Sequence, residues 1–139
     1  MNSSESEQEV RTYGDGDSSY LAAGGEAGLR RLVDDFYDAM AHLPEAKRIR
    51  DMHSKDLTGS RDKLARFLCG WLGGPKRYQE KYGTIRIPKA HNHLDIGLEE
   101  RDAWLRCMEE ALKTQPYALS FKTYLMAQLF VPADRSRNR

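Results

Sequence analysis

Hydrophobic side chains recur with the period of an α-helix over most of the chain. Between residues 29 and 40 they fall three or four positions apart, so that they share one face of a helix. The residues on this face are Leu29, Leu32, Val33, Phe36, Tyr37 and Met40. Comparable faces lie within residues 57–71, 98–112 and 117–131, and no long stretch shows the alternation of a strand. The pattern predicts an all-α fold with about five principal helices and short connectors.

Glycine and proline residues separate these helices. Pro44 opens a short helix in the sequence "LPEAKRIRDMH". The sequence "GGP" at residues 73–75 ends the helix that begins near Leu57, and "KRYQEKYG" after it predicts one more short helix. Pro116 separates the last two long helices. The connectors are short except for the stretch from Tyr82 onward, which carries few large apolar side chains before the next helix begins.

Both ends of the chain differ from its helical middle. Residues 1–17 hold five acidic side chains against one arginine and almost no large aliphatic ones. Such a stretch buries too little apolar surface to offset the entropy of ordering, so we expect a disordered acidic tail. Residues 133–139 predict a short basic tail. The sequence therefore predicts one folded domain over residues 18–132, which is large enough to bury a core of its own.

Charge and composition exclude several classes of function. The net charge of +1 offers no strong basic excess of the kind that nucleic-acid binding usually requires. No apolar run approaches the roughly 18 residues needed to cross a membrane, and no signal segment opens the chain. Cys69 and Cys107 lie apart within helical patterns, which indicates free thiols and a cytoplasmic location.

The sequence "IPKAHNHLDIGLEERDAWLRCM" at residues 87–108 places two histidines just ahead of a long helix. His91 and His93 could bind a metal, transfer a proton or simply lie on the surface. A zinc ion would need two further ligands at suitable spacing, and both cysteines look like isolated core residues. Zinc is therefore the weaker of the metal hypotheses.

Three predicted helix faces carry polar or amphipathic side chains where an ordinary core favours leucine. They are Tyr37, Ser60 and Trp104. A buried tyrosine or tryptophan needs a partner for its O–H or N–H group, and a bound ligand could supply it. The same aromatic side chains could equally be ordinary core residues at helical spacing, so the pattern alone leaves both interpretations open.

Several phrases resemble the truncated haemoglobins of the second group. The sequence "FLCGWLGGPKRY" at residues 67–78 is similar to a family phrase of the type FL-x-x-[WY]-x-GGP-x-x-Y. The sequence "ERDAWLRCM" at 100–108 begins nine residues after a histidine, while "FY" at 36–37 and "MHSKDL" at 52–57 fit the same pattern. The resemblance extends from about residue 20 to about residue 131. It implies a truncated globin fold, a two-over-two helical sandwich that holds haem b.

The resemblance implies that His91 is the proximal ligand of the haem iron. The family places this histidine nine residues before the glutamate of "ERDAW". Haem iron takes one proximal imidazole and leaves its opposite face for another ligand. Residues two apart on a helix diverge by about 200°, so His91 and His93 could not both face one iron. We therefore expect His93 at the surface or beside a haem propionate.

The same resemblance places Tyr37, His53, Ser60 and Trp104 on the distal side of the haem. An O₂ ligand carries partial negative charge and favours hydrogen-bond donors, which a phenol and an indole provide. His53 could donate to the ligand or to Tyr37, or could itself bind the sixth position of the iron. Ser60 occupies the position of the gating histidine of classical globins, where a small side chain leaves an open path or hosts a water.

The resemblance also implies a set of cofactor contacts. They are Lys63, Leu64, Phe67, Tyr78, Arg86, Ile96 and Trp104. Lys63, Tyr78 and Arg86 are the candidates for the propionates, although each could be an ordinary residue on a solvated face. One departure from the family lies directly before His91, where relatives often have an arginine and this chain has Ala90. The usual arginine link to the haem is therefore absent here, and Lys89 or His93 could replace it.

The function implied by this resemblance is binding of O₂, and also of NO or CO, at a pentacoordinate or weakly hexacoordinate haem iron. The alternative is an enzyme, an NO dioxygenase or a peroxidase-like detoxifying protein. Such an enzyme needs a separate reductase as partner, because the chain has no flavin or nicotinamide domain. A third hypothesis is a helical interaction module without haem. No nucleic acid or membrane is expected as a partner, and we expect a monomer or a weak homodimer.

Overall fold

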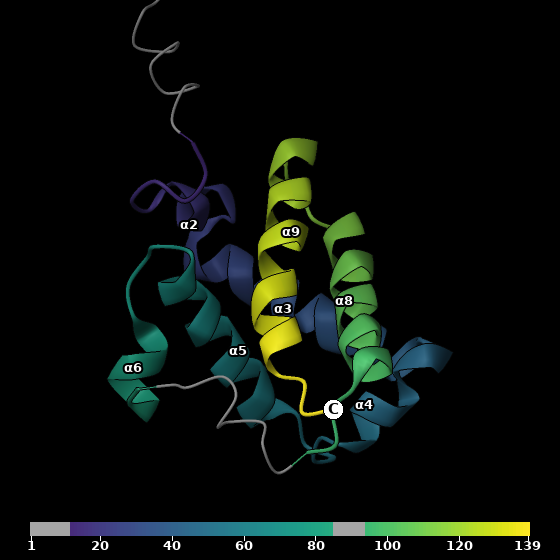
Figure 1. The fold of residues 1–139 in the computed structure, drawn as a ribbon. Coiled ribbons are helices and arrows are strands. Elements are labelled where there is room, and N and C mark those ends of the chain that lie inside the picture. The colour runs from purple at the N-terminus through teal and green to yellow at the C-terminus, as the bar shows by residue number, and fades with distance from the viewer. Residues whose placement is uncertain (1–11, 85–93) are drawn as a thin grey trace, which may run out of the picture.

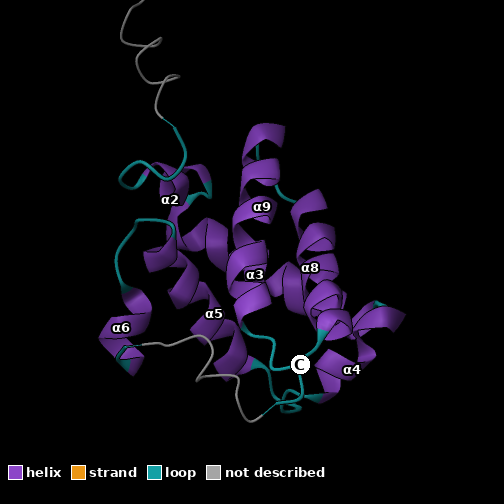
Figure 2. Cartoon of the chain, viewed as in Figure 1, coloured by secondary structure: helices purple, strands orange, loops and turns teal. Residues whose placement is uncertain are grey.

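The computed structural model of the chain describes residues 12–84 and 94–139, and every regular element within them is a helix (Figure 1, Figure 2). The helices are α2 (Ser18–Ala22), α3 (Gly25–His42), the 3-10 helix η1 (Pro44–Ala46), α4 (Lys47–Asp51), α5 (Thr58–Trp71), α6 (Arg77–Tyr82), α8 (Leu98–Lys113) and α9 (Leu119–Arg135). The predicted all-α fold is confirmed. The single short helix predicted after Pro44 is in fact two, because η1 and α4 follow each other directly.

The helix α3 is the centre of the fold. It packs against α5 on one side and against α8 on the other, and α8 in turn packs against α9. In Figure 1, α8 and α9 lie side by side, with α3 crossing behind them. Because the helices form these two layers, the apolar face of α3 has to pack against both α5 and α8.

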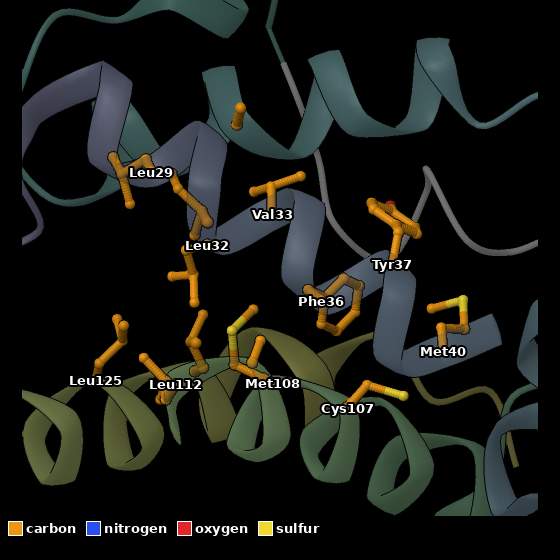
Figure 3. Packing of buried hydrophobic residues seen from close by; sticks show 14 of the residues in the cluster. Leu29, Leu32, Val33, Phe36, Tyr37, Met40, Cys107, Met108, Leu112 and Leu125 are labelled. Atoms are coloured by element: carbon orange, nitrogen blue, oxygen red, sulfur yellow. The ribbon is translucent and has the colours of Figure 1, made fainter. Parts of the chain in front are cut away.

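The core confirms the periodicity read from the sequence. The six residues of the predicted α3 face are all buried. Figure 3 shows how they divide: Leu32 and Phe36 point towards the layer formed by α8 and α9, whereas Val33 and Tyr37 point towards α5. The main partners in the second layer are Cys107, Met108, Leu112, Phe121, Leu125 and Leu129. Within the described residues, no helix is both long enough and apolar enough to cross a membrane.

The first described residues are packed against the domain. Residues 1–11 lie outside the described part, but Tyr13 already contacts α9. Its ring centroid lies 5.3 Å from that of Phe121, and its hydroxyl oxygen lies 2.8 Å from Ser120 Oγ. The packed region therefore begins before residue 18, where the composition of residues 1–17 predicts a tail.

The end of the chain also differs from the prediction. The composition of residues 133–139 predicts a short basic tail, whereas in the structure α9 continues to Arg135, and Asn138 and Arg139 bond to residues between 94 and 100. The described end of the chain is therefore packed against the domain. The cause is visible in the structure: two acidic side chains from a distant part of the sequence, Asp95 and Glu100, pair with Arg139.

Candidate functional site

A cavity of ≈ 330 Å³ lies at one end of the core, between α5, α6, the start of α8 and the end of α9. Its volume falls within the range of pockets that bind cofactors and other small molecules. Every residue nominated from the sequence that the structure describes lines this cavity. These residues are Tyr37, His53, Ser60, Lys63, Leu64, Phe67, Tyr78, Ile96 and Trp104. The other two nominated residues, Arg86 and His91, lie outside the described residues, as does His93.

The helix α5 supplies one wall of the cavity through its regular spacing. Ser60, Lys63, Leu64 and Phe67 lie three, four and seven positions apart, so one face of α5 turns towards the cavity. The apolar side chains on this face are only half-buried, whereas Leu68 is buried in the core. This arrangement explains why polar side chains interrupt the apolar pattern: they face a cavity rather than another helix.

Tyr37 brings a buried hydroxyl from α3 to the cavity. The side chain is 5% exposed, and its hydroxyl donates a long hydrogen bond of 3.5 Å to the backbone carbonyl of Ser60. The Arg61 guanidinium carbon lies 5.6 Å from the centroid of the ring. Burial raises the pKa of Tyr37 to about 12, so the phenol is neutral and keeps its proton at physiological pH. Tyr37 is therefore a hydrogen-bond donor whose present bond, to the Ser60 carbonyl, is long and weak.

His53 packs edge-on against Tyr37, with ring centroids 5.7 Å apart and planes at 78°. Its Nδ1 lies 2.8 Å from the Ile49 carbonyl oxygen. A carbonyl only accepts hydrogen bonds, so Nδ1 carries the proton, and Nε2 of the neutral ring is an acceptor. His53 could then donate a hydrogen bond into the cavity only as the imidazolium. The role of donor that the sequence suggested for this residue is therefore limited to its protonated form.

Trp104 reaches the cavity from α8. The indole is half-buried and packs on Phe36, with ring centroids 4.9 Å apart. Phe36 also contacts the Tyr37 ring at 4.9 Å. One core phenylalanine thus supports both aromatic donors, Tyr37 and Trp104, and limits how far either ring can move.

The carboxylate of Asp62 joins three helices at the edge of the cavity. It accepts hydrogen bonds from Tyr82 at 2.6 Å, from Lys81 at 2.8 Å and from Arg66 at 3.0 Å, and it pairs with Arg30 at 3.1 Å. The hydrogen bonds from Lys81 and Tyr82 hold the pKa of Asp62 well below its usual range. This carboxylate ties α3 and α5 to α6.

Tyr78 lines the cavity from α6, the short helix that Asp62 anchors. Its ring centroid lies 5.0 Å from that of Tyr82, the residue that donates to Asp62. Lys63, directly after Asp62 on α5, is exposed and points its Nζ at the Tyr82 ring, 5.4 Å from the centroid. A lysine and a tyrosine hydroxyl therefore lie on the same side of the cavity, where they could contact an anionic group.

Several residues of the cavity were not nominated from the sequence. They are Ile49, Met52, Leu94, Glu100, Leu129, Pro132, Ala133 and Ser136. Most are apolar side chains from α4 and from the end of α9, and only the packing of these elements brings them to the site. Glu100 could have been noticed, because an acidic residue on the apolar face of a helix needs a polar partner. Its Oε1 accepts a hydrogen bond of 2.7 Å from the Gly97 N–H and so caps α8.

The described part of the chain contains no group of three or more His, Cys, Asp or Glu side chains that could hold a metal ion. Both cysteines are buried, and burial raises the pKa of the Cys107 thiol to about 11. Cys107 is therefore protonated and packed as a small apolar residue.

Comparison with known proteins gives a consistent result. A sequence model of the family described as "bacterial-like globin" matches residues 18–129. The chain is 34% identical over 115 residues to the "Group 2 truncated hemoglobin YjbI" of Bacillus subtilis (strain 168), which covers 83% of this chain and 85% of that protein.

Solved structures agree. The "Group II 2-on-2 Hemoglobin" of Agrobacterium tumefaciens superposes with a TM-score of 0.82 at 35% identity, covering 93% of this chain and 96% of that one. The "truncated oxygen-avid haemoglobin" of Bacillus subtilis superposes with a TM-score of 0.77 at 34% identity, covering 86% of this chain and 98% of that one. The matched region contains every helix that lines the cavity except the last turns of α9.

Proposed function

The chain belongs to the bacterial-like globin family, as a truncated haemoglobin of the second group, and from this premise we propose that it binds haem b and uses it to bind O₂. A haem iron with one proximal imidazole supplies a site where a diatomic gas binds reversibly. We propose His91 as that imidazole. Leu94, three residues further along the sequence, lines the cavity, which supports this assignment.

The side chains around the cavity fit such a group. Haem is a flat and largely apolar molecule with two carboxylates on one edge. Leu64, Phe67 and Ile96 offer apolar walls, while Lys63 and Tyr78 offer a cation and a hydroxyl on the α6 side. We propose that these two contact the propionates, with Arg86 as a further candidate.

The distal donors are Tyr37 and Trp104. Tyr37 supports this role best, because its neutral hydroxyl is buried beside the cavity and held only by a 3.5 Å bond to a carbonyl. A ligand with partial negative charge would offer a better acceptor than that distant carbonyl. Trp104 adds a second donor whose position is fixed by Phe36. His53 orients Tyr37 through ring contact, and its Nε2 makes it the candidate for a weak sixth ligand of the iron.

One observation carries the proposal: side chains from α3, α5, α6 and α8, nominated from the sequence through the family resemblance, meet around a single cavity. Absorption spectra of the purified protein in ferric, ferrous and CO-bound forms test it directly. We expect a Soret band that His91→Ala abolishes or weakens. His93→Ala is the matched control, two residues away, and should keep the band. A colourless protein that cannot be loaded with haem would overturn the proposal.

The ligand set extends in our proposal to NO and CO, which bind the same iron. Consumption of NO by the O₂-loaded protein, with and without an added reductase, separates a binding protein from an NO dioxygenase. We expect stoichiometric reaction without sustained turnover. Sustained turnover with a reductase would make the enzyme the correct assignment. We also propose that the protein acts in the cytoplasm, where its two buried thiols would stay reduced.

A further inference from the structure

The last two residues of this sequence pair with the segment that precedes α8. The Asn138 backbone N–H donates to the Ile96 carbonyl at 2.8 Å, and the Ile96 N–H donates back to Asn138 Oδ1 at 2.9 Å. The Asn138 side-chain amide also donates to the carbonyl of Leu94. In Figure 1 the end of the chain, marked C, lies beside the start of α8. The two backbone bonds of Ile96 to Asn138 satisfy both the N–H and the carbonyl group of Ile96, which is buried.

Charged side chains reinforce this pairing. Arg139 donates from Nε to Asp95 at 2.6 Å and from Nη2 to Glu100 at 2.9 Å. Arg48, which comes from α4, pairs with the same two carboxylates at 3.0 and 2.9 Å. The side chain of Glu100 is only 3% exposed, so its charge depends on these two arginines and on the Gly97 N–H.

A side chain at position 97 would displace the guanidinium of Arg139. An added Cβ on Gly97 would lie 2.7 Å from Arg139 Nη1 and 2.8 Å from its Cζ. The backbone φ of Gly97 is −115°, which any residue can adopt, so space rather than conformation favours glycine here. The guanidinium of Arg139 is packed directly against the backbone that caps α8.

These contacts lie on the wall of the proposed haem cavity. The cavity is lined at the start of α8 by Leu94, Ile96 and Glu100. The segment after α9, which pairs with this region, contributes Ser136. Leu94 and Ile96 are the first described residues after His91 that face the cavity. Anything that loosens the segment 94–97 therefore opens this wall.

We propose that Asn138 and Arg139 form a clasp that fixes residues 94–97 against the cavity and so slows the loss of haem. The inference rests on the proposed function, because it assumes that the cavity holds haem. Arg139 and Asn138 are positioning residues, since they touch the wall and not the cavity itself. The bond from Arg139 to Glu100 matters most, because its loss leaves a buried carboxylate with a single arginine partner.

Transfer of haem from the loaded protein to an excess of apomyoglobin tests the clasp. We expect the double variant Asn138→Ala/Arg139→Gln to lose haem about tenfold faster, since it removes several hydrogen bonds, two of them to carboxylates. Arg135→Gln is the matched control: it removes one positive charge from the same stretch, and Arg135 is exposed and forms no ion pair with the described residues 94–100. Arg139→Lys should recover only part of the effect, because an ammonium cannot reproduce the two-pronged contact.

If Asn138 and Arg139 only stabilised the fold, another variant that destabilises the fold equally would lose haem equally fast. Leu29→Ala removes a fully buried side chain that does not line the cavity, so it lowers global stability without touching the clasp. If Leu29→Ala accelerates haem loss as much as the double variant at equal loss of thermal stability, the clasp has no specific role and the inference fails. Equal haem loss in the double variant and in Arg135→Gln would overturn it too.

Amide hydrogen exchange separates this inference from the proposed function. We expect the Ile96 and Gly97 amides of the haem-loaded protein to exchange faster in the double variant, while core amides of α3 stay unchanged. If the wild-type protein takes up no haem, the proposed function fails and the inference falls with it. If it takes up haem and the double variant retains it at the wild-type rate, the inference alone is wrong.

Discussion

The two ends of the helical sandwich are held together by different interactions. Away from the cavity, Leu29 and Leu32 of α3 are fully buried (Figure 3). Phe121 of α9 is fully buried in the same core. At the cavity end, the apolar side chains that α5 turns to the cavity, Leu64 and Phe67, are only half-buried, because they face the cavity rather than a partner helix. The helices there are linked instead by ion pairs: Asp62 pairs with Arg30 of α3 and Lys81 of α6, and Glu100 pairs with Arg139.

The difference shows how a small helical domain can keep a cavity open. Apolar faces that close on each other stabilise the fold at once, but they leave no space for a ligand. Apolar faces turned towards a cavity contribute little to the stability of the fold until a ligand fills the cavity. The surrounding helices therefore need other interactions to hold them together. Polar links on the rim satisfy this need without occupying the cavity. The comparison predicts that the core end determines stability, and the cavity end determines the binding properties.

The largest effect should come from the core. Leu32→Ala leaves a void where no side chain is exposed, and we expect the free energy of unfolding to fall by roughly 2–5 kcal/mol. Leu64→Ala is the matched control, because Leu64 lines the cavity and is half-buried. Urea unfolding of the haem-free proteins measures both changes. A loss at Leu64 equal to the loss at Leu32 would contradict the comparison.

A smaller effect is expected at Asp62. The side chain of Asp62 is 18% exposed and serves four donors, so Asp62→Asn should lower the free energy of unfolding by about 1–2 kcal/mol. Asp102→Asn is the control: its carboxylate is 63% exposed and pairs with Arg101, so the change should be under about 0.5 kcal/mol. Urea unfolding at neutral pH measures the free energy of unfolding of both variants. Similar losses in the two variants would show that Asp62 is an ordinary surface carboxylate.

Acid should weaken the same link. The folded-state pKa of Asp62 lies below its ordinary value of 3.8, so its contribution is complete above that value and is lost as the pH falls below it. Between pH 7 and pH 3, the wild-type protein should therefore lose about 1 kcal/mol of the advantage that it holds over Asp62→Asn. Unfolding curves of both proteins across this range measure the gap. A gap that stays constant or widens in acid would contradict the assignment.

These two ends also differ in how far the sequence predicted them. The core face of α3 follows directly from its spacing, because each apolar residue has only one helix face on which to lie. The cavity residues on α5 were identified through the family phrases, since Ser60 and Lys63 break the apolar pattern and give no direction by themselves. The contributions of Met52 and Leu129 were missed, because an apolar residue that lines a cavity has the same sequence pattern as one that fills a core.

The contacts of Asn138 and Arg139 were the furthest from prediction. Local composition predicts a solvated basic segment, and only the folded chain brings it to Asp95 and Glu100, about 40 residues away in sequence. Charge patterns identify partners reliably within one helix, where spacing fixes the distance. Pairs between distant segments depend on the packing of every element between them. Tertiary ion pairs are thus the least predictable part of this site.

The smallest effect on stability is expected where the effect on binding is largest. Tyr37→Phe removes a hydroxyl whose bond to the Ser60 carbonyl is 3.5 Å long, so unfolding should change by less than about 0.5 kcal/mol. The ring still packs on Phe36 and His53, and the cavity keeps its shape. Release of O₂ from the haem-loaded protein should nevertheless become about tenfold faster, because a donor to a partially charged ligand is lost.

Displacement of O₂ by CO in a stopped-flow instrument measures this release. Tyr78→Phe is the matched control, since it removes the same hydroxyl from α6, where we propose a propionate contact rather than a ligand contact. We expect it to leave O₂ release unchanged. If both variants release O₂ at the wild-type rate, Tyr37 is a core residue that borders the cavity, and the two ends of the molecule differ in packing alone. If only Tyr37→Phe accelerates release, a side chain from the central core helix controls binding with almost no share in stability, which is the separation that the two ends of the fold predict.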